Sequence, residues 1–236
     1  MDLKEKVVVI TGSSDGLGKE TALRLAKEGA KLALISRNEE ELKKVAESTK
    51  ELGAPEAKAY KCDIRETDRL KEVAGEIVRE FGGVDILINN AGIWQRLMPL
   101  EEIPEEEIDA VIETNLSAMI HLTNILMPEL KKSKEAAILN VVSKSGVEAK
   151  TNQSVYNASK YGARGFTENL ILDLEGSNIR VAGLYQGGTN TKMFEKVGNH
   201  PPKIDQFTDP KDLADVVAYM LSQPEKIWLY EIRVSY

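Results

Sequence analysis

The chain has little of what disulfide scaffolds, metal centres and membrane spans require. Its 236 residues include one cysteine and two histidines, and no apolar run approaches the length of a membrane helix. Cys62 alone cannot form an intramolecular disulfide or a multi-thiolate metal site. His121 and His200 lack neighbours at ligand spacing, so we predict no metal site. We interpret His121 as a helix packing residue and His200 as a surface loop residue. Without an apolar span or a secretory leader, we expect a cytoplasmic protein with no membrane partner.

Clusters of basic residues are missing as well. The formal net charge is -7 at pH 7, and no stripe of lysine and arginine is present. Proteins that bind nucleic acid gain affinity by neutralising phosphates with such clusters, so we expect no nucleic-acid partner. The densest acidic segment, 101–107, surrounds Pro104 and is typical of a helix start, because carboxylates in a first turn interact favourably with the helix dipole.

Short apolar runs rich in β-branched residues alternate along the chain with longer stretches of helical periodicity. This alternation is typical of βαβ units and predicts an α/β fold: one Rossmann-type, doubly wound, seven-stranded parallel sheet with helices on both faces. The expected strands are 6–11, 31–36, 57–61, 84–89, 136–142, 179–184 and 228–234. The expected helices are 17–28, 39–52, 67–80, 104–130, 153–173 and 210–222. No linker or repeat interrupts the pattern, so residues 1–236 are predicted to form a single domain with its ligand at the carboxyl ends of the strands.

One segment departs from this rhythm. Residues 194–207 contain Gly198, Pro201 and Pro202 and show neither a helical nor a strand period. We interpret the segment as a lid over the substrate, with a passive surface connection as the alternative.

A glycine-rich loop follows the first expected strand directly. It reads Thr11-Gly12-Ser13-Ser14-Asp15-Gly16-Leu17-Gly18, and helical periodicity begins at its end. Glycines let backbone amides approach a pyrophosphate, and the helix N-terminus adds partial positive charge. The position of the loop favours a dinucleotide cradle over an ordinary strand-to-helix turn.

The end of the second expected strand indicates which dinucleotide binds. An acidic residue there would hold the 2′-hydroxyl of NAD, whereas an arginine accommodates the 2′-phosphate of NADP. The chain has Ser36 and Arg37, so NADP(H) is preferred and NAD(H) remains possible. Asp15 in the glycine loop would oppose a phosphate placed nearby, and Arg37 could instead be a solvated loop residue.

Tyr156 and Lys160 are four residues apart in an expected helix and therefore share one of its faces. An adjacent ammonium stabilises a phenolate, so we expect Lys160 to lower the pKa of Tyr156 and make it usable as an acid or base. A solvated surface pair is the alternative. Ser143 follows the expected strand 136–142 and precedes Tyr156 by thirteen residues, which would bring all three groups to the carboxyl edge of the sheet.

With these groups the chain resembles the short-chain dehydrogenase/reductase family over nearly its whole length. The matching pieces are Thr11-Gly12-x-x-x-Gly16-x-Gly18, Asp63 after the third strand, Asn89-Asn90-Ala91-Gly92 after the fourth, Asn115, Ser143 and Tyr156-x-x-x-Lys160. Each piece is modest alone, but their order and spacing together are specific.

The resemblance implies catalytic roles for four residues. Tyr156 would protonate a carbonyl oxygen as hydride arrives, or take the hydroxyl proton in the reverse reaction. Ser143 would hold that oxygen, and Lys160 would hold the nicotinamide ribose and tune the tyrosine. Asn115 would position a water that relays the proton.

The resemblance also implies the cofactor contacts. Asp63 would meet the adenine edge, Asn90 and its neighbours the ribose, and Thr189 or Thr191 the carboxamide. The expected cofactor-binding residues are Gly12, Ser14, Asp15, Gly16, Leu17, Gly18, Ser36, Arg37, Asp63, Ile64, Asn90, Ala91, Gly92, Tyr156, Lys160, Gly187, Thr189 and Thr191. Where the family usually has Pro-Gly, this chain has Gln186-Gly187, which should loosen that turn.

The substrate is expected to contact Ser143 inside a pocket walled by Val147, Gln153 and the lid, with Trp94 and Phe194 as apolar platforms. The predicted function is hydride transfer between NADP(H) and a small carbonyl compound or alcohol. An epimerase or dehydratase of the same fold and a non-catalytic dinucleotide sensor are the alternatives.

The family pairs helices equivalent to 104–130 and 153–173 between subunits, which implies a homotetramer or a homodimer. The expected last strand, with Trp228, Tyr230 and Tyr236, would form a second contact, and this favours the tetramer.

Overall fold

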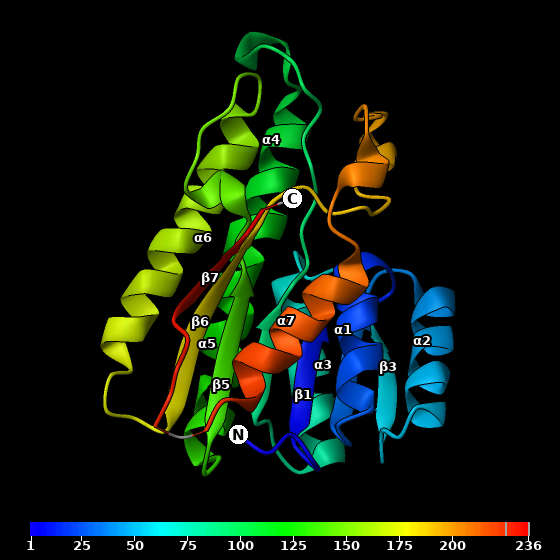
Figure 1. The fold of residues 1–236 in the computed structure, drawn as a ribbon, viewed down its shortest axis with the longest axis vertical. Coiled ribbons are helices and arrows are strands. Elements are labelled where there is room, and N and C mark those ends of the chain that lie inside the picture. Colours follow the sequence, from blue (N-terminus) through cyan, green and yellow to red (C-terminus); the bar gives the residue numbers. More distant parts are fainter. Residues whose placement is uncertain (225, 236) are drawn as a thin grey trace.

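The computed structural model describes residues 1–224 and 226–235 and contains a seven-stranded parallel sheet in the order β3-β2-β1-β4-β5-β6-β7. The central strands are apolar and buried on both faces, which suits a sheet covered on each side. This arrangement confirms the predicted doubly wound α/β fold (Figure 1). The strands are β1 (Val7–Thr11), β2 (Lys31–Ser36), β3 (Ala57–Lys61), β4 (Ile86–Asn89), β5 (Ala136–Val141), β6 (Ile179–Gln186) and β7 (Glu231–Val234).

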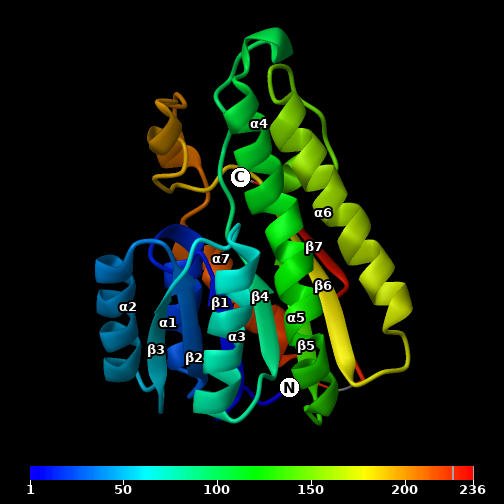
Figure 2. The ribbon, with the colours of Figure 1, turned by 180° about the vertical axis from the view of Figure 1, so that it is seen from behind.

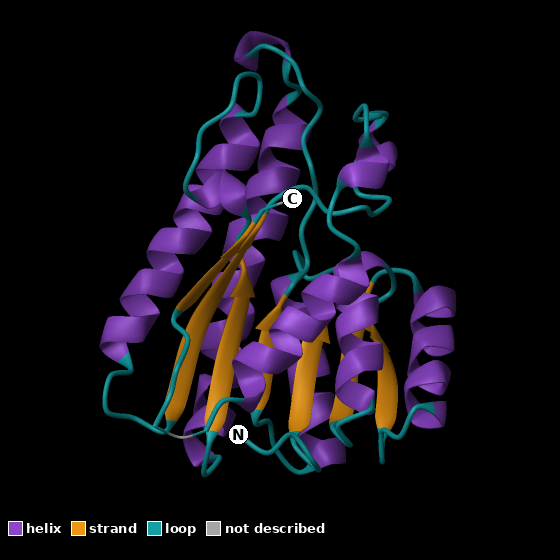
Figure 3. Cartoon of the chain, in the orientation of Figure 1, coloured by secondary structure: helices purple, strands orange, loops and turns teal. Residues whose placement is uncertain are grey.

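Helices cover both faces of the sheet. One apolar core lies between the sheet and α1, α2 and α7, and a second lies between the sheet and α3, α5 and part of α6 (Figures 1 and 2). Figure 3 shows the same layers coloured by secondary structure. The helices are α1 (Gly16–Ala26), α2 (Glu39–Glu51), α3 (Thr67–Phe81), α4 (Glu105–Ile112), α5 (Ala118–Lys132), α6 (Ser154–Asp173) and α7 (Pro210–Ser222). In the described part of the chain, none of them is both long and apolar enough to cross a bilayer.

The last two strands differ from their expected bounds. β7 begins at Glu231 rather than at 228, because Trp228 packs beside the sheet and donates its indole N–H to the carbonyl of Val181 at 2.7 Å. β6 continues through Gln186, which pairs with Val234, and the amide of Gly187 donates to the Val234 carbonyl at 2.9 Å. The expected loosening at Gln186 is therefore wrong, since the strand simply extends.

The expected helix 104–130 is interrupted. α4 passes through a π-helical turn, η2 (Glu113–Ser117), before α5 begins. Asn115 lies in this turn and is fully buried. A π-helical turn shifts the backbone hydrogen-bond pattern, and such turns are frequent at functional sites. His121, on α5, is exposed within this chain, so its expected packing role is not observed here.

Candidate active site

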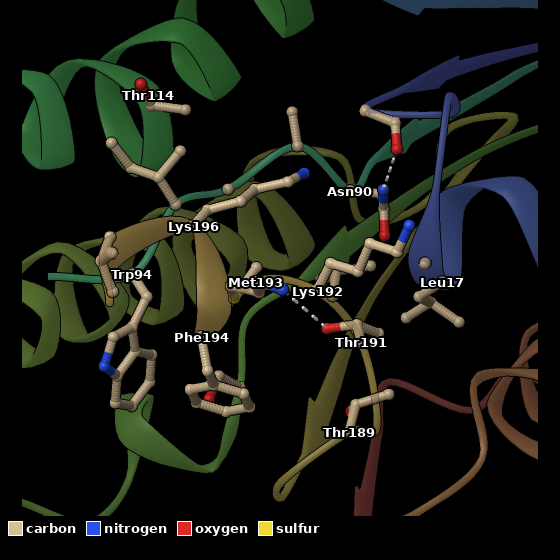
Figure 4. A pocket seen from close by; sticks show the side chains of 18 of the residues that line it. Leu17, Asn90, Trp94, Thr114, Thr189, Thr191, Lys192, Met193, Phe194 and Lys196 are labelled. Atoms are coloured by element: carbon tan, nitrogen blue, oxygen red, sulfur yellow. Dashed lines mark hydrogen bonds between the residues drawn. The ribbon is translucent and has the colours of Figure 1, made fainter. Parts of the chain in front are cut away.

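A cavity of about 1180 Å³ lies at the carboxyl edge of the sheet, between the ends of β1, β2, β4, β5 and β6 and the segment 194–207. Figure 4 shows part of its wall. The cavity is lined by nearly all of the expected site residues: Gly12, Ser14, Asp15, Gly16, Leu17, Ser36, Arg37, Asp63, Ile64, Asn90, Ala91, Gly92, Trp94, Ser143, Gln153, Tyr156, Lys160, Gly187, Thr189, Thr191 and Phe194. Gly18, Asn115 and Val147 are absent from the lining.

Two glycines let the loop after β1 pack closely. Gly12 has φ +65°, and a Cβ there would lie 2.8 Å from the Cα of Ala91. Gly18 is buried, and a Cβ there would lie 2.4 Å from both Asn90 Nδ2 and the Gly12 carbonyl. Gly18 therefore allows the loop and helix to approach each other, rather than lining the cavity as expected.

Asn90 fixes the same loop. Its amide Nδ2 donates to the carbonyls of Thr11 and Gly12 at 2.9 and 3.2 Å. Its backbone N–H and that of Ala91 donate to Thr11 Oγ1 at 3.1 and 3.0 Å. The side chain expected beside a ribose thus holds the cradle in shape, as Figure 4 shows at the right of the cavity.

The end of β2 presents a serine and an arginine to the cavity. Ser36 Oγ lies 2.8 Å from Ser14 Oγ, which joins β2 to the glycine loop. Arg37 is 62% exposed, and its Nη1 lies 4.0 Å from Asp63 Oδ2. The Arg65 guanidinium donates to the same carboxylate, with a shortest N···O distance of 2.7 Å, and these hydrogen bonds lower the pKa of Asp63. The charge of Arg37 is a lesser cause of the same lowering. Asp63 is thus already paired, and Arg37 extends to the rim of the cavity.

Asp15 has a partner that its sequence position does not suggest. Lys196 Nζ donates to Asp15 Oδ2 at 2.6 Å, across 181 residues. Lys196 lies in η4 (Glu195–Val197), inside the expected lid, so this ion pair joins the lid to the glycine loop. Asp15 is the residue that precedes α1, and its side chain makes no capping bond to that helix.

Backbone contacts join residues that flank the expected lid, 194–207, and the side chain of Phe194 inside it is buried. Thr189 and Thr208 form a parallel bridge, and the amide of Asn190 donates to the Thr208 carbonyl at 3.0 Å. Phe194 is buried and packs against Trp94 with ring centres 5.1 Å apart. The segment therefore lies against the cavity wall, as Figure 4 shows for Phe194 and Trp94.

Tyr156 and Lys160 lie in the first turns of α6 and are each 4% exposed. The Tyr156 hydroxyl is hydrogen-bonded to Ser143, and Lys160 Nζ donates to the Val141 carbonyl at 3.1 Å. Burial raises the pKa of Tyr156 to about 12, opposed in part by the Ser143 hydrogen bond. Burial likewise lowers the pKa of Lys160 to about 8. The expectation that Lys160 lowers the tyrosine pKa is thus wrong for this structure, because removal from water dominates.

Ser143 has a backbone conformation that is rare for a residue with a side chain. Its φ is 101°, and its hydroxyl accepts a hydrogen bond from the amide of Ser145 at 3.2 Å. Residues held in such regions cost roughly 1–3 kcal/mol and occur most often at active sites. The strain places the Ser143 hydroxyl beside Tyr156.

Asn115 links the elements that surround the site. Its side chain accepts from the Ile93 amide at 2.8 Å and donates to the Ile93 carbonyl at 3.0 Å and to Ser159 Oγ at 3.1 Å. These bonds link η2 to the loop after β4 and to α6. Asn115 does not line the cavity, and the water relay stays a prediction.

Four aromatic side chains of the cavity wall lie in contact with one another. The Trp94 ring lies 4.2 Å from the Tyr156 ring, and Phe194 contacts Phe207 with centres 5.8 Å apart. Val147 packs instead in a separate small core with Met119 and Tyr185, so the expectation that it lines the pocket is wrong. A proton donor next to a second hydroxyl and an aromatic wall can bind and protonate a polarised oxygen.

Comparison with known proteins agrees with this geometry. The family model described as short chain dehydrogenase matches residues 6–202. A 3-oxoacyl-(acyl-carrier-protein) reductase of Thermotoga maritima, FabG, is 32% identical over 229 residues, covering 94% of this chain and 92% of that protein.

Solved structures resemble the whole chain. An alcohol dehydrogenase of the archaeon Thermococcus sibiricus, complexed with 5-hydroxy-NADP, has a TM-score of 0.89 at 27% identity and covers 98% of this chain and 96% of its own. An NAD+-bound xylitol dehydrogenase has a TM-score of 0.88 at 28% identity, with 99% and 98% covered.

Proposed function

The chain belongs to the short-chain dehydrogenase/reductase family and is an oxidoreductase of that family, and from this premise we propose that it transfers hydride between NADP(H) and a small carbonyl compound or alcohol. The observation that carries the proposal is the buried Tyr156 hydroxyl, hydrogen-bonded to Ser143 in the cavity that also contains the glycine loop. A cradle and a proton donor in one cavity are what carbonyl reduction requires.

The residues of the cradle fit a dinucleotide. The first turn of α1 carries no acidic side chain, so the positive end of its dipole is free to face a phosphate. Gly12 and Gly16 both have positive φ and line the cavity through their backbone. We propose that they hold the pyrophosphate, with Lys160 near the nicotinamide ribose. The bound nicotinamide supplies or accepts the hydride.

The chain's own residues handle the proton. Because the pKa of Tyr156 is raised to about 12, the phenol keeps its proton at neutral pH and can donate it to a carbonyl oxygen. Ser143 holds that oxygen by a hydrogen bond. The phenolate that remains is stabilised by the hydrogen bond from Ser143, and Lys160 Nζ lies 5.8 Å from the Tyr156 ring centre.

A preference for NADP(H) is supported by Ser36 and Arg37 at the end of β2. A guanidinium binds a 2′-phosphate through two parallel N–H bonds, and the small serine leaves room for it. The Thermococcus sibiricus structure contains a hydroxylated NADP and the xylitol dehydrogenase contains NAD+, so both nucleotides occur on this fold.

The first test is a panel of aldehydes, ketones and diketones supplied with NADPH or NADH and monitored by absorbance. We expect stoichiometric oxidation of NADPH with at least one carbonyl compound. An epimerase would convert substrate without net consumption of nucleotide, and a sensor would bind nucleotide without turnover; either result would contradict the proposal.

The second test measures the Kd of each nucleotide for the parent and for Arg37→Ala. A hydrogen bond to a charged group contributes about 1.5–3 kcal/mol, so we expect NADPH to bind roughly 10–100-fold more weakly and NADH to bind about as before. Equal losses for both nucleotides would mean that Arg37 only supports its loop.

A further inference from the structure

Three buried polar atoms on residues that line the cavity have no hydrogen-bond partner within the described residues. They are Trp94 Nε1, Gln153 Oε1 and, at the end of β6, Gln186 Oε1. Gln153 is 8% exposed, and its backbone carbonyl accepts from the backbone N–H of Asn157 at 2.8 Å, but its side-chain oxygen has no partner. Buried polar atoms are nearly always paired, so these atoms point to a ligand that pairs with them.

Trp94 and Gln153 are both neighbours of Tyr156, the proposed proton donor. The Trp94 ring is 4.2 Å from the Tyr156 ring. Gln153 precedes Tyr156 by three residues at the start of α6, and residues three apart on a helix are neighbours. Since Tyr156 would protonate the reacting oxygen, we place a group that meets Trp94 and Gln153 next to the reacting carbon.

The hydrogen-bonding chemistry of Trp94 Nε1 and Gln153 Oε1 restricts which substrate group can pair with both. An indole N–H can only donate, and an amide oxygen can only accept. A second carbonyl or an ether oxygen accepts but cannot donate, so it would leave Gln153 Oε1 unpaired. A hydroxyl accepts from Trp94 and donates to Gln153 at the same time.

We infer that the substrate is an α-hydroxy ketone or α-hydroxy aldehyde, with a vicinal diol as the corresponding alcohol. This inference rests on the proposed function and specifies its substrate class. The carbonyl carbon receives the hydride from the dinucleotide, the carbonyl oxygen receives the proton of Tyr156, and the neighbouring hydroxyl is held unchanged by Trp94 and Gln153. The aromatic rings of Phe194 and Phe207 cover the carbon skeleton.

The test uses three ketones of similar size with NADPH. They are 3-hydroxybutan-2-one, its methyl analogue 3-methylbutan-2-one and its ether 3-methoxybutan-2-one. For the parent we expect kcat/KM to be at least about tenfold higher for the hydroxy ketone than for the methyl analogue, since two neutral hydrogen bonds are gained. We expect the ether to remain below the hydroxy ketone because it cannot donate to Gln153.

Substitutions in the pocket separate recognition of the substrate hydroxyl from the intrinsic reactivity of each ketone, because the intrinsic reactivity of a given ketone is the same with every variant. Gln153→Met and Trp94→Phe each remove one hydrogen-bonding group and keep most of the side-chain volume. We expect each to lower the ratio of kcat/KM for the hydroxy ketone over the methyl analogue by about 3–10-fold. Trp228→Phe is the matched control: its indole bonds to Val181 inside the fold, so it should lower thermal stability and leave the ratio unchanged.

The outcomes distinguish a failure of the inferred substrate class from a failure of the proposed function. Similar kcat/KM values for the three ketones in the parent, or an unchanged ratio in both folded pocket variants, would overturn the inference and leave the proposed function standing. Turnover of no carbonyl compound with either nucleotide would overturn both. Thermal melting of each variant shows whether a lost ratio comes from a folded protein.

Discussion

At the scale of single residues, burial moves the pKa values of Tyr156 and Lys160 in opposite directions. The phenol is shifted up to about 12 and the ammonium down to about 8. In both cases removal from water disfavours the charged form relative to the same group in solvent. A neutral phenol is the form required to protonate a carbonyl, whereas the reverse reaction needs the phenolate.

Tyr156→Phe tests the proton donor directly. We expect the variant to fold and to bind NADPH, because only a hydroxyl is deleted. The rate of carbonyl reduction should fall by about 10²–10⁴-fold, the usual contribution of general acid catalysis. Steady-state kinetics and nucleotide titration of the same preparation provide the measurement. Turnover within a few-fold of the parent would show that another group donates the proton.

Lys160→Met tests the cost of the buried ammonium. The folded pKa of about 8 lies below the ordinary value of 10.5, so the unfolded chain binds more protons between these values. Above about pH 10.5 Lys160 is neutral in both the folded and the unfolded chain, so its burial does not destabilise the parent. As the pH falls through 8 the folded lysine also becomes charged, and the parent then carries the full penalty of a buried ammonium. At pH 7 the Met variant should be more stable than the parent by about 1–3 kcal/mol, and inactive.

The pH dependence of that difference is the decisive measurement. Urea unfolding at pH 7 and at pH 9.5 should show the stability advantage of Lys160→Met shrinking at the higher pH. A variant less stable than the parent at pH 7 would mean that the lost hydrogen bond to the Val141 carbonyl matters more than the buried charge. The matched surface change Lys132→Met, on α5, should alter stability little at either pH.

At the scale of elements, an ion pair joins the segment 194–207, the expected lid, to the glycine loop. Asp15 was expected to repel a 2′-phosphate, but Lys196 neutralises it at 2.6 Å. Both side chains are about half exposed, so the pair contributes little to global stability. Its importance is local, because breaking it leaves a carboxylate unpaired beside the nucleotide cradle.

We therefore expect Lys196→Ala to weaken NADPH binding about 2–5-fold, with a smaller effect on NADH. The double variant Asp15→Ser/Lys196→Ala should restore the NADPH affinity, since the unpaired carboxylate is then absent. Dissociation constants of both nucleotides for the parent, Asp15→Ser, Lys196→Ala and the double variant complete the cycle. Equal losses for the two nucleotides, with no restoration in the double variant, would indicate that Lys196 acts only by holding the lid in place.

The sequence predicted the positions of secondary-structure elements and motifs better than it predicted contacts between side chains that are distant in the sequence. Buried strands such as β1 and β5 are long apolar runs, and the glycine loop and Tyr156-x-x-x-Lys160 have fixed spacings, so both could be located in advance. The Asp15–Lys196 pair joins residues 181 apart, and no local pattern signals it.

Physical environment was equally hard to predict. The pKa of Tyr156 depends on how much water the surrounding elements exclude, which spacing along α6 does not reveal. Asn90 and Gly18 were placed correctly at the cradle, but their contacts are with the loop itself. The bounds of β7 shifted because the Trp228 indole found a partner in Val181.

At the scale of the whole molecule, six of the nine large apolar side chains that are exposed among the described residues lie in two regions, and Leu52, Leu97 and Leu100 lie outside them. Ile120, Tyr161 and Leu172 project from α5 and α6, with Leu172 68% exposed. Tyr219, Ile227 and Tyr230 project from α7 and from the approach to β7. Tyr236, also expected at a contact, lies outside the described residues. Exposed apolar groups gathered on two separate regions are typical of surfaces that meet other subunits.

The last prediction is that the chain forms a homotetramer with two kinds of contact, one through α5 and α6 and one through α7 and β7. Most soluble oligomers are closed and symmetric, and two different twofold contacts on one subunit generate a tetramer. Light scattering at micromolar concentration should therefore give four times the subunit mass of 26.1 kDa. A buried aspartate opposes association, so Tyr161→Asp and Tyr219→Asp should each reduce the assembly to a dimer through the contact that remains. Leu52→Asp, an equally apolar exposed position at the end of α2 and remote from both regions, should leave the mass unchanged. A parent mass equal to one subunit would contradict the assembly, and a dimer abolished by only one of the two tyrosine variants would identify the single contact that exists.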